Sequence, residues 1–158
     1  MQTLVSFKED LCREDFNAIP FINADGYHSK TIAYSIWHIF RIEDIVAHTV
    51  ITEDEQVFFT GNYQVRINSP IITTGNELVK QQIADFSKQL NLEELYSYIF
   101  EVRESTEKIL ERFSYDELKW KIPDERKGYL KSLNVVNCDE KAIWLIDYSV
   151  SYTHLTLP

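Results

Sequence analysis

Residues 30–51 read KTIAYSIWHIFRIEDIVAHTVI and contain neither glycine nor proline. Apolar residues recur along this stretch at helical spacing and do not alternate as they would in a strand. Ser29 precedes the stretch, and its hydroxyl can accept from the unpaired N–H groups of a first helical turn. We therefore predict a helix from about Lys30 to Ile51, about 33 Å long at 1.5 Å per residue.

The rest of the chain also favours helices. The sequence has 158 residues with only four glycines and four prolines. The clearest pattern lies at 92–113, where apolar residues three or four apart line one face, and Asn91 with Glu94 has the spacing of a capping box. Further helices are predicted at 77–90, after Ser114 and over the opening turns at 139–148. The predicted fold class is all-α.

A long connection, residues 52–74, separates two of the predicted helices. It holds five apolar or aromatic side chains, namely Phe58, Phe59, Tyr63, Val65 and Ile67. Loops of this length are uncommon in a compact domain unless they cover or shape something. We expect a packed, irregular segment over one end of a helical bundle.

A helical wheel at 100° per residue assigns a direction to each side chain of the 30–51 helix. Arg41, Asp44 and His48 cluster on one side, with Trp37 beside them. This side is predicted to face solvent or a partner, with Asp44 and His48 as an i,i+4 pair.

His38 and Glu43 are the two unusual polar residues of the same helix. His38 shares its side with Ile42 and Ile45, so its imidazole is predicted to point into the bundle. Glu43 lies on the most apolar strip, which includes Ile39, and an unpaired buried carboxylate is costly. We expect Glu43 to meet an arginine or a backbone donor.

Composition and charge limit the function classes. A chain of this length normally forms one domain with a single core. The formal net charge of −9 disfavours nucleic acid and anionic membrane surfaces as partners. Cys12 and Cys138 fit no C-x-x-C or zinc-finger spacing, and the N-terminal residues lack a signal-peptide pattern, so a cytoplasmic location is expected.

The chemistry of His38 supports two interpretations. Imidazole is a good ligand for zinc, nickel or iron near neutral pH, because one ring nitrogen is free to coordinate. A single histidine is equally compatible with a packed, hydrogen-bonded role. The sequence contains none of the H-E-x-x-H, P-loop, G-x-G-x-x-G and G-x-S-x-G motifs.

The segment IWHIFRIED at residues 36–44 resembles the signature of one branch of the DinB/YfiT-like superfamily, which is unrelated to the DNA polymerase of the same name. The likeness continues through Thr74-Gly75-Asn76 and through AIWLIDY at residues 142–148, so it covers most of the chain. This resemblance implies an up-down four-helix bundle.

The same resemblance implies a divalent metal, zinc or nickel, held by three histidines. His38 matches the first ligand, and the H-x-x-x-H pair expected on the last bundle helix has no counterpart here. Arg41, Glu43 and Asp44 are then candidates for supporting or structural roles around His38. Some characterised members are S-transferases that use low-molecular-weight thiols.

Residues 150–158, VSYTHLTLP, resemble a translated sequencing adapter, so His154 is not expected to be a ligand. We interpret residues 1–149 as a partial DinB-like domain and 150–158 as a non-native tail. The last bundle helix is expected to be incomplete. The first bundle helix is a further candidate for truncation. One histidine does not hold a metal tightly, so this chain is expected to have little or no activity.

Two hypotheses for function follow. The first is a metal-dependent transferase or hydrolase acting on a small molecule, with a low-molecular-weight thiol as a candidate partner and His38 as a metal ligand. The alternative is a non-catalytic helical bundle that acts as a dimerising or stress-associated binding protein. Binding of an apolar ligand under residues 52–74 is a third interpretation, with no motif to support it.

Overall fold

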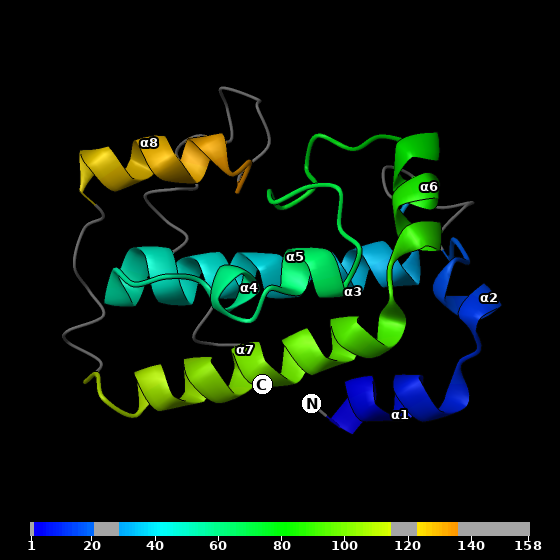
Figure 1. The fold of residues 1–158 in the computed structure, drawn as a ribbon, viewed down its shortest axis with the longest axis horizontal. Coiled ribbons are helices and arrows are strands. Elements are labelled where there is room, and N and C mark those ends of the chain that lie inside the picture. The colour runs from blue at the N-terminus through cyan, green and yellow to red at the C-terminus, as the bar shows by residue number, and fades with distance from the viewer. Residues whose placement is uncertain (1, 21–28, 115–122, 136–158) are drawn as a thin grey trace.

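The computed structural model describes residues 2–20, 29–114 and 123–135. Every regular element in these ranges is a helix, so the predicted all-α class is confirmed (Figure 1). In chain order the elements are α1 (Gln2–Asp10), α2 (Arg13–Phe16), α3 (Ile32–Asp44), η1 (Ile45–Thr52), α4 (Val57–Thr60), α5 (Tyr63–Arg66), α6 (Gln81–Gln89), α7 (Leu92–Leu110) and α8 (Asp124–Ser132).

The helix predicted over residues 30–51 consists of two parts with different geometry. Its N-cap is Thr31 instead of Ser29, because the Thr31 hydroxyl accepts from the backbone N–H of Tyr34 at 3.1 Å. The α-helix α3 ends at Asp44 and continues as the π-helix η1, in which the hydrogen bonds span five residues and the turn is wider. A wheel drawn at the α-helical angle therefore loses its accuracy beyond Asp44.

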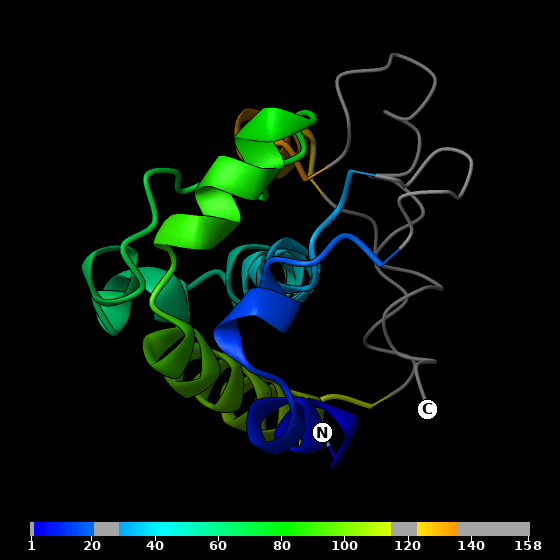
Figure 2. The same cartoon turned by 90° about the vertical axis from the view of Figure 1, so that its right-hand side faces the viewer.

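The other long helix, α7, agrees closely with its sequence pattern. Asn91 caps it by accepting from the N–H groups of Glu93 and Glu94 at 3.1 and 3.3 Å, whereas the Glu94 carboxylate accepts from Arg66 and does not complete the predicted capping box. The α3 and α7 helices pack along each other, and Figure 2 shows α3 nearly end-on with α7, α6 and the α4–α5 segment around it.

The helix predicted at 77–90 is shorter than expected. The α6 helix begins at Gln81, directly after Lys80, whose φ of 48° lies in the left-handed region. A non-glycine residue in that region interrupts a right-handed helix. The helix therefore starts four residues later than the apolar pattern indicates.

Residues 52–74 are packed, as predicted, but they are not wholly irregular. They contain the short helices α4 and α5, which the apolar pattern does not predict. Phe58, Tyr63 and Ile67 are almost fully buried, and the Ile67 carbonyl accepts from the N–H of Asn91 at 2.8 Å. This segment therefore forms one wall of the core beside α3 and α7.

Two groups of apolar side chains form the core of the described residues. The larger joins α3, α6 and α7 with the aromatic residues of 52–74. The smaller lies between η1 and α8 and consists of Ile45, Val50, Leu130, Leu133 and Val135. The α8 helix is thus held mainly by the π-helical end of the long helix.

Several predictions fall outside the described residues. They concern the first residues of the helix after Ser114, the helical turns at 139–148, the tail at 150–158 and Cys138. Among the helices that the structure does describe, none is long and apolar enough to span a membrane.

Candidate functional site

Arg41 and Asp44 are both fully buried, which corrects the prediction that they face solvent or a partner. The Arg41 guanidinium donates to the Asp44 carboxylate at 3.1 Å, so the two charges neutralise each other one turn apart on α3. It also donates to the side chain of Gln56 at 2.9 Å and to the carbonyl of Ile72 at 2.6 Å. The helical wheel predicted the wrong exposure because it contains no information about residues 52–74. These residues supply the hydrogen-bond partners that allow the charged side of α3 to be buried.

The Asp44 carboxylate fastens three helices together. It accepts from the backbone N–H groups of Val57 and Phe58, both at 2.9 Å, and so caps the first turn of α4. It also accepts from the Tyr98 hydroxyl of α7 at 2.9 Å. Burial raises the pKa of Asp44, and the Arg41 guanidinium is the strongest influence in the opposite direction. These contacts give Arg41 and Asp44 a structural role.

Trp37 and Ile39 also differ from their predicted directions. Trp37 is fully buried, with its ring 4.7 Å from that of Phe86 on α6. Ile39, assigned to the most apolar strip, is 54% exposed. The rest of the fold packs on the side of α3 that carries Trp37 and Arg41. The apolar strip that contains Ile39 is therefore less buried than this more polar side.

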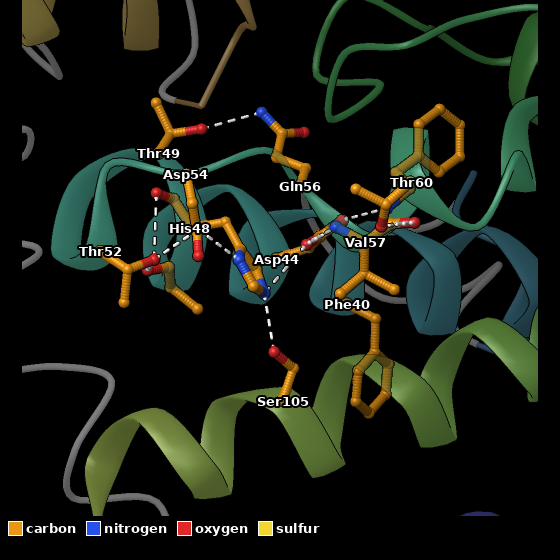
Figure 3. A network of polar contacts seen from close by, with 12 residues as sticks. Phe40, Asp44, His48, Thr49, Thr52, Asp54, Gln56, Val57, Thr60 and Ser105 are labelled. Atoms are coloured by element: carbon orange, nitrogen blue, oxygen red, sulfur yellow. Dashed lines mark hydrogen bonds and ion pairs between the residues drawn. The ribbon is translucent and has the colours of Figure 1, made fainter. Parts of the chain in front are cut away.

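His48 lies at the centre of a second polar cluster, shown in Figure 3. Its Nδ1 is 2.6 Å from the Asp54 carboxylate, and its Nε2 is 3.0 Å from the hydroxyl of Ser105 on α7. The predicted pair with Asp44 exists only as a 4.0 Å approach. His48 is 6% exposed, which corrects its assignment to the outer face. Sequence spacing offered no sign that Asp54 and Ser105 would meet this imidazole.

Glu43 fulfils the expectation that it would meet an arginine. Its carboxylate accepts from Arg103 of α7 at 3.3 Å, and its side chain is 19% exposed. The contact joins α3 to α7 at the edge of the core. Glu43 therefore has a packing role distinct from the surroundings of His38.

His38 is half-buried and bonded through one ring nitrogen. Its Nδ1 lies 2.6 Å from the backbone carbonyl of Thr74, and its ring stacks on Tyr34 with centroids 5.5 Å apart. A carbonyl only accepts, so Nδ1 carries the hydrogen and, in the neutral ring, Nε2 keeps its lone pair. Nε2 forms no hydrogen bond with any of the described residues.

The surroundings of His38 favour the neutral imidazole. Burial lowers its pKa below the ordinary value, and the Thr74 carbonyl opposes this shift. Lys30 lowers the pKa further, whereas Glu77 raises it. A neutral ring with one bonded N–H and one free lone pair is the arrangement that a metal-ligating histidine usually adopts.

The backbone at Gly75 holds the Thr74 carbonyl beneath His38. Gly75 has a φ of 80°, and its own carbonyl accepts from the Tyr34 hydroxyl at 2.9 Å. A Cβ atom at this position would lie 2.9 Å from the Trp37 ring and 3.0 Å from the Tyr34 ring. Only glycine fits both the conformation and the space.

Replacing Gly75 with alanine is expected to lower the free energy of unfolding by about 1–3 kcal/mol, through backbone strain and crowding. Gly128 is a matched control, because a Cβ there meets no atom within 4 Å in α8. Alanine at Gly128 is expected to be neutral or stabilising, since glycine weakens a helix interior. Urea unfolding followed by circular dichroism measures both, and equal effects would contradict the role of Gly75.

A metal site built from His38 needs further ligands. Within residues 2–20, 29–114 and 123–135, no group of three histidine, cysteine or acidic side chains is placed to hold a metal ion. His38 can therefore serve as one metal ligand, with its ring oriented by the Thr74 carbonyl. The described residues do not supply the remaining ligands.

A cavity of about 310 Å³ lies apart from His38, between the end of η1 and α8. Its wall contains seven residues, namely Thr49, Glu53, Asp54, Glu55, Gln56, Phe59 and Tyr129. Three of them are acidic, and the cavity is open to solvent. His38 is the stronger candidate site, because its ring has a bonded Nδ1 and an Nε2 suited to coordination.

Comparison with known proteins adds no assignment. No family model, no curated protein and no solved structure matches this chain.

Proposed function

We propose that this chain is a DinB-like helical protein in which His38 is one ligand of a divalent zinc or nickel ion. The observation that carries the proposal is the hydrogen bond from His38 Nδ1 to the Thr74 carbonyl, which leaves Nε2 available for coordination. The resemblance of residues 36–44 to the DinB/YfiT-like signature supports the same assignment.

With a complete metal site, the proposed activity is transfer to, or hydrolysis of, a small molecule, with a low-molecular-weight thiol as the candidate co-substrate. His38 as a single ligand is expected to give little or no activity. A bound divalent ion lowers the pKa of a coordinated water or thiol and so supplies a nucleophile near neutral pH. The part played by this chain is to fix the His38 ring between Tyr34 and the Thr74 carbonyl and to keep it neutral.

The cellular setting and the assembly belong to the same proposal. Cys12 is exposed and unpaired, which is compatible with a reducing, cytoplasmic compartment. A homodimer is the proposed assembly. The non-catalytic binding protein remains the alternative function.

Paramagnetic Ni²⁺ provides a residue-specific test of the His38 assignment. Added to isotope-labelled protein, Ni²⁺ is expected to shift or broaden the NMR signals of His38 and of its neighbours Tyr34 and Thr74. Binding is expected to be weak, because one imidazole provides a single ligand. The changes should be absent in His38→Ala and retained in His28→Ala.

The same experiment separates the alternatives. Identical changes in wild type and His38→Ala would refute the ligand assignment. Absence of any change near His38 in the wild-type protein would favour the non-catalytic binding protein.

A further inference from the structure

The direction of the hydrogen bonds through Asp54, His48 and Ser105 follows from their chemistry. Burial acts to raise the pKa of Asp54, but hydrogen bonds from Thr52 and His48 outweigh it, so the pKa is lowered and the carboxylate accepts only. His48 Nδ1, 2.6 Å from Asp54, therefore carries the hydrogen, and Nε2 carries the lone pair in the neutral ring. The Ser105 hydroxyl, 3.0 Å from Nε2, must then be the donor.

Three parts of the chain hold these side chains in place: η1, the turn at Glu53 and, from the other side, α7. His48 projects from η1, and the chain reverses at Glu53, whose φ of 60° is left-handed. The reversal is closed by a hydrogen bond from the Asp54 N–H to the His48 carbonyl at 3.0 Å, and the Thr52 hydroxyl donates to the Asp54 carboxylate. π-Helical turns are rare and are found frequently at functional sites.

Ser105 approaches His48 from the opposite side and is only partly buried. It lies in the second half of α7, which packs against η1, so the serine and the imidazole meet across a helix interface (Figure 3). The Asp44 carboxylate, which is paired with Arg41, lies 4.0 Å from His48 Nε2.

The geometry points to Ser105 as a nucleophile toward activated esters, with His48 as its general base and Asp54 as a positioning residue. A nucleophile, a base bonded to it and a third group that orients the base form the arrangement that serine acyl transfer requires. This activity is separate from a metal at His38 and does not depend on it.

The proposed reaction consumes only the ester and water. The Ser105 oxygen forms a bond to the acyl carbon while its proton moves to His48 Nε2. The bond to the leaving alcohol or phenol breaks, and the leaving oxygen takes the proton from His48. Water then attacks the acyl group by the same route, which releases the acid and restores Ser105.

The position of Ser105 restricts the substrate class. It lies inside α7, where backbone N–H groups are committed to helical hydrogen bonds and do not stabilise an oxyanion. Esters with good leaving groups need the least stabilisation of this kind. Activated aryl esters are therefore the expected substrates, and simple amides are not.

A fluorophosphonate probe tests the proposal directly, because phosphorus is attacked by the serine oxygen while fluoride leaves and His48 takes the proton. We expect an adduct on Ser105 in the intact chain, located by mass spectrometry, and its loss in Ser105→Ala. His48→Asn should slow labelling by about 100-fold or more, as expected for loss of a general base. Asp54 is 57% exposed, so Asp54→Asn should slow labelling less.

Ser97 provides the matched control. It lies two turns earlier on α7, and its hydroxyl donates to the Glu93 carbonyl at 3.1 Å instead of to an imidazole. Ser97→Ala should therefore label at the wild-type rate. A folded wild-type protein without an adduct on Ser105 would overturn the proposal, as would equal labelling of Ser97. Since Ser105→Ala is a small change at a partly exposed position, this test does not depend on whether His48→Asn folds.

Discussion

Replacing Asp44 with alanine is expected to lower the free energy of unfolding by about 3–5 kcal/mol, because Arg41 is left as an uncompensated buried charge. The same change removes the acceptor for the N–H groups of Val57 and Phe58 and for the Tyr98 hydroxyl. A loss of this size is a large fraction of the stability of an ordinary domain. Urea unfolding followed by circular dichroism measures the effect.

Asp85 is the control for the Asp44 experiment. It lies on α6, is exposed, and its carboxylate accepts from the side chain of Gln81 at 2.8 Å. Asp85→Ala is expected to change the unfolding free energy little, because water replaces the lost contact. If Asp44→Ala were as mild as Asp85→Ala, the carboxylate would not be holding α3, α4 and α7 together.

Replacing Trp37 with alanine is expected to lower the free energy of unfolding by about 3–5 kcal/mol, the usual range for removing a large buried aromatic side chain. Trp37 is fully buried and contacts the ring of Phe86, so its loss leaves a cavity between α3 and α6. Thermal and urea unfolding by circular dichroism are the suitable measurements, since the substitution also removes an indole fluorophore.

Ile39 is the matched control for Trp37, because it lies two residues further along α3 and is 54% exposed. Ile39→Ala should change the unfolding free energy by about 0.5 kcal/mol or less, as surface substitutions usually do. The original wheel, in which Ile39 is on the core strip and Trp37 borders the outer face, predicts the opposite order. The relative size of the two effects therefore distinguishes the two orientations of α3.

Local signals in the sequence predicted the two long helical segments, residues 30–51 and 92–113, but not the short helices α4 and α5. Asn91 caps α7 as its spacing indicated, and α7 extends to within three residues of its predicted end. Glu43 meets Arg103 because a carboxylate among apolar neighbours requires a partner. These features depend on residues close together in the chain or on the cost of an isolated charge, so the sequence contains the necessary information.

The candidate sites were predictable only in part. The sequence predicted a site at His38, and that prediction stays open; the bond of His38 to the Thr74 carbonyl depends on the left-handed turn at Gly75, 37 residues later. Ser105 and Asp54 gave no signal, because a serine on a helix and an aspartate in a turn are common. Their contact with His48 requires η1 to widen after Asp44 and the chain to reverse at Glu53.

From the sequence alone, the chain is predicted to be helical, and His38 and Glu43 stand out as polar residues of the segment 30–51. Which side of this helix is buried is seen only in the folded chain. The reason is that burial of Arg41 and Asp44 depends on donors and acceptors brought from residues 52–74 and from α7. Periodicity along one helix ranks its faces by apolarity, whereas burial is determined by the partners that the rest of the fold supplies.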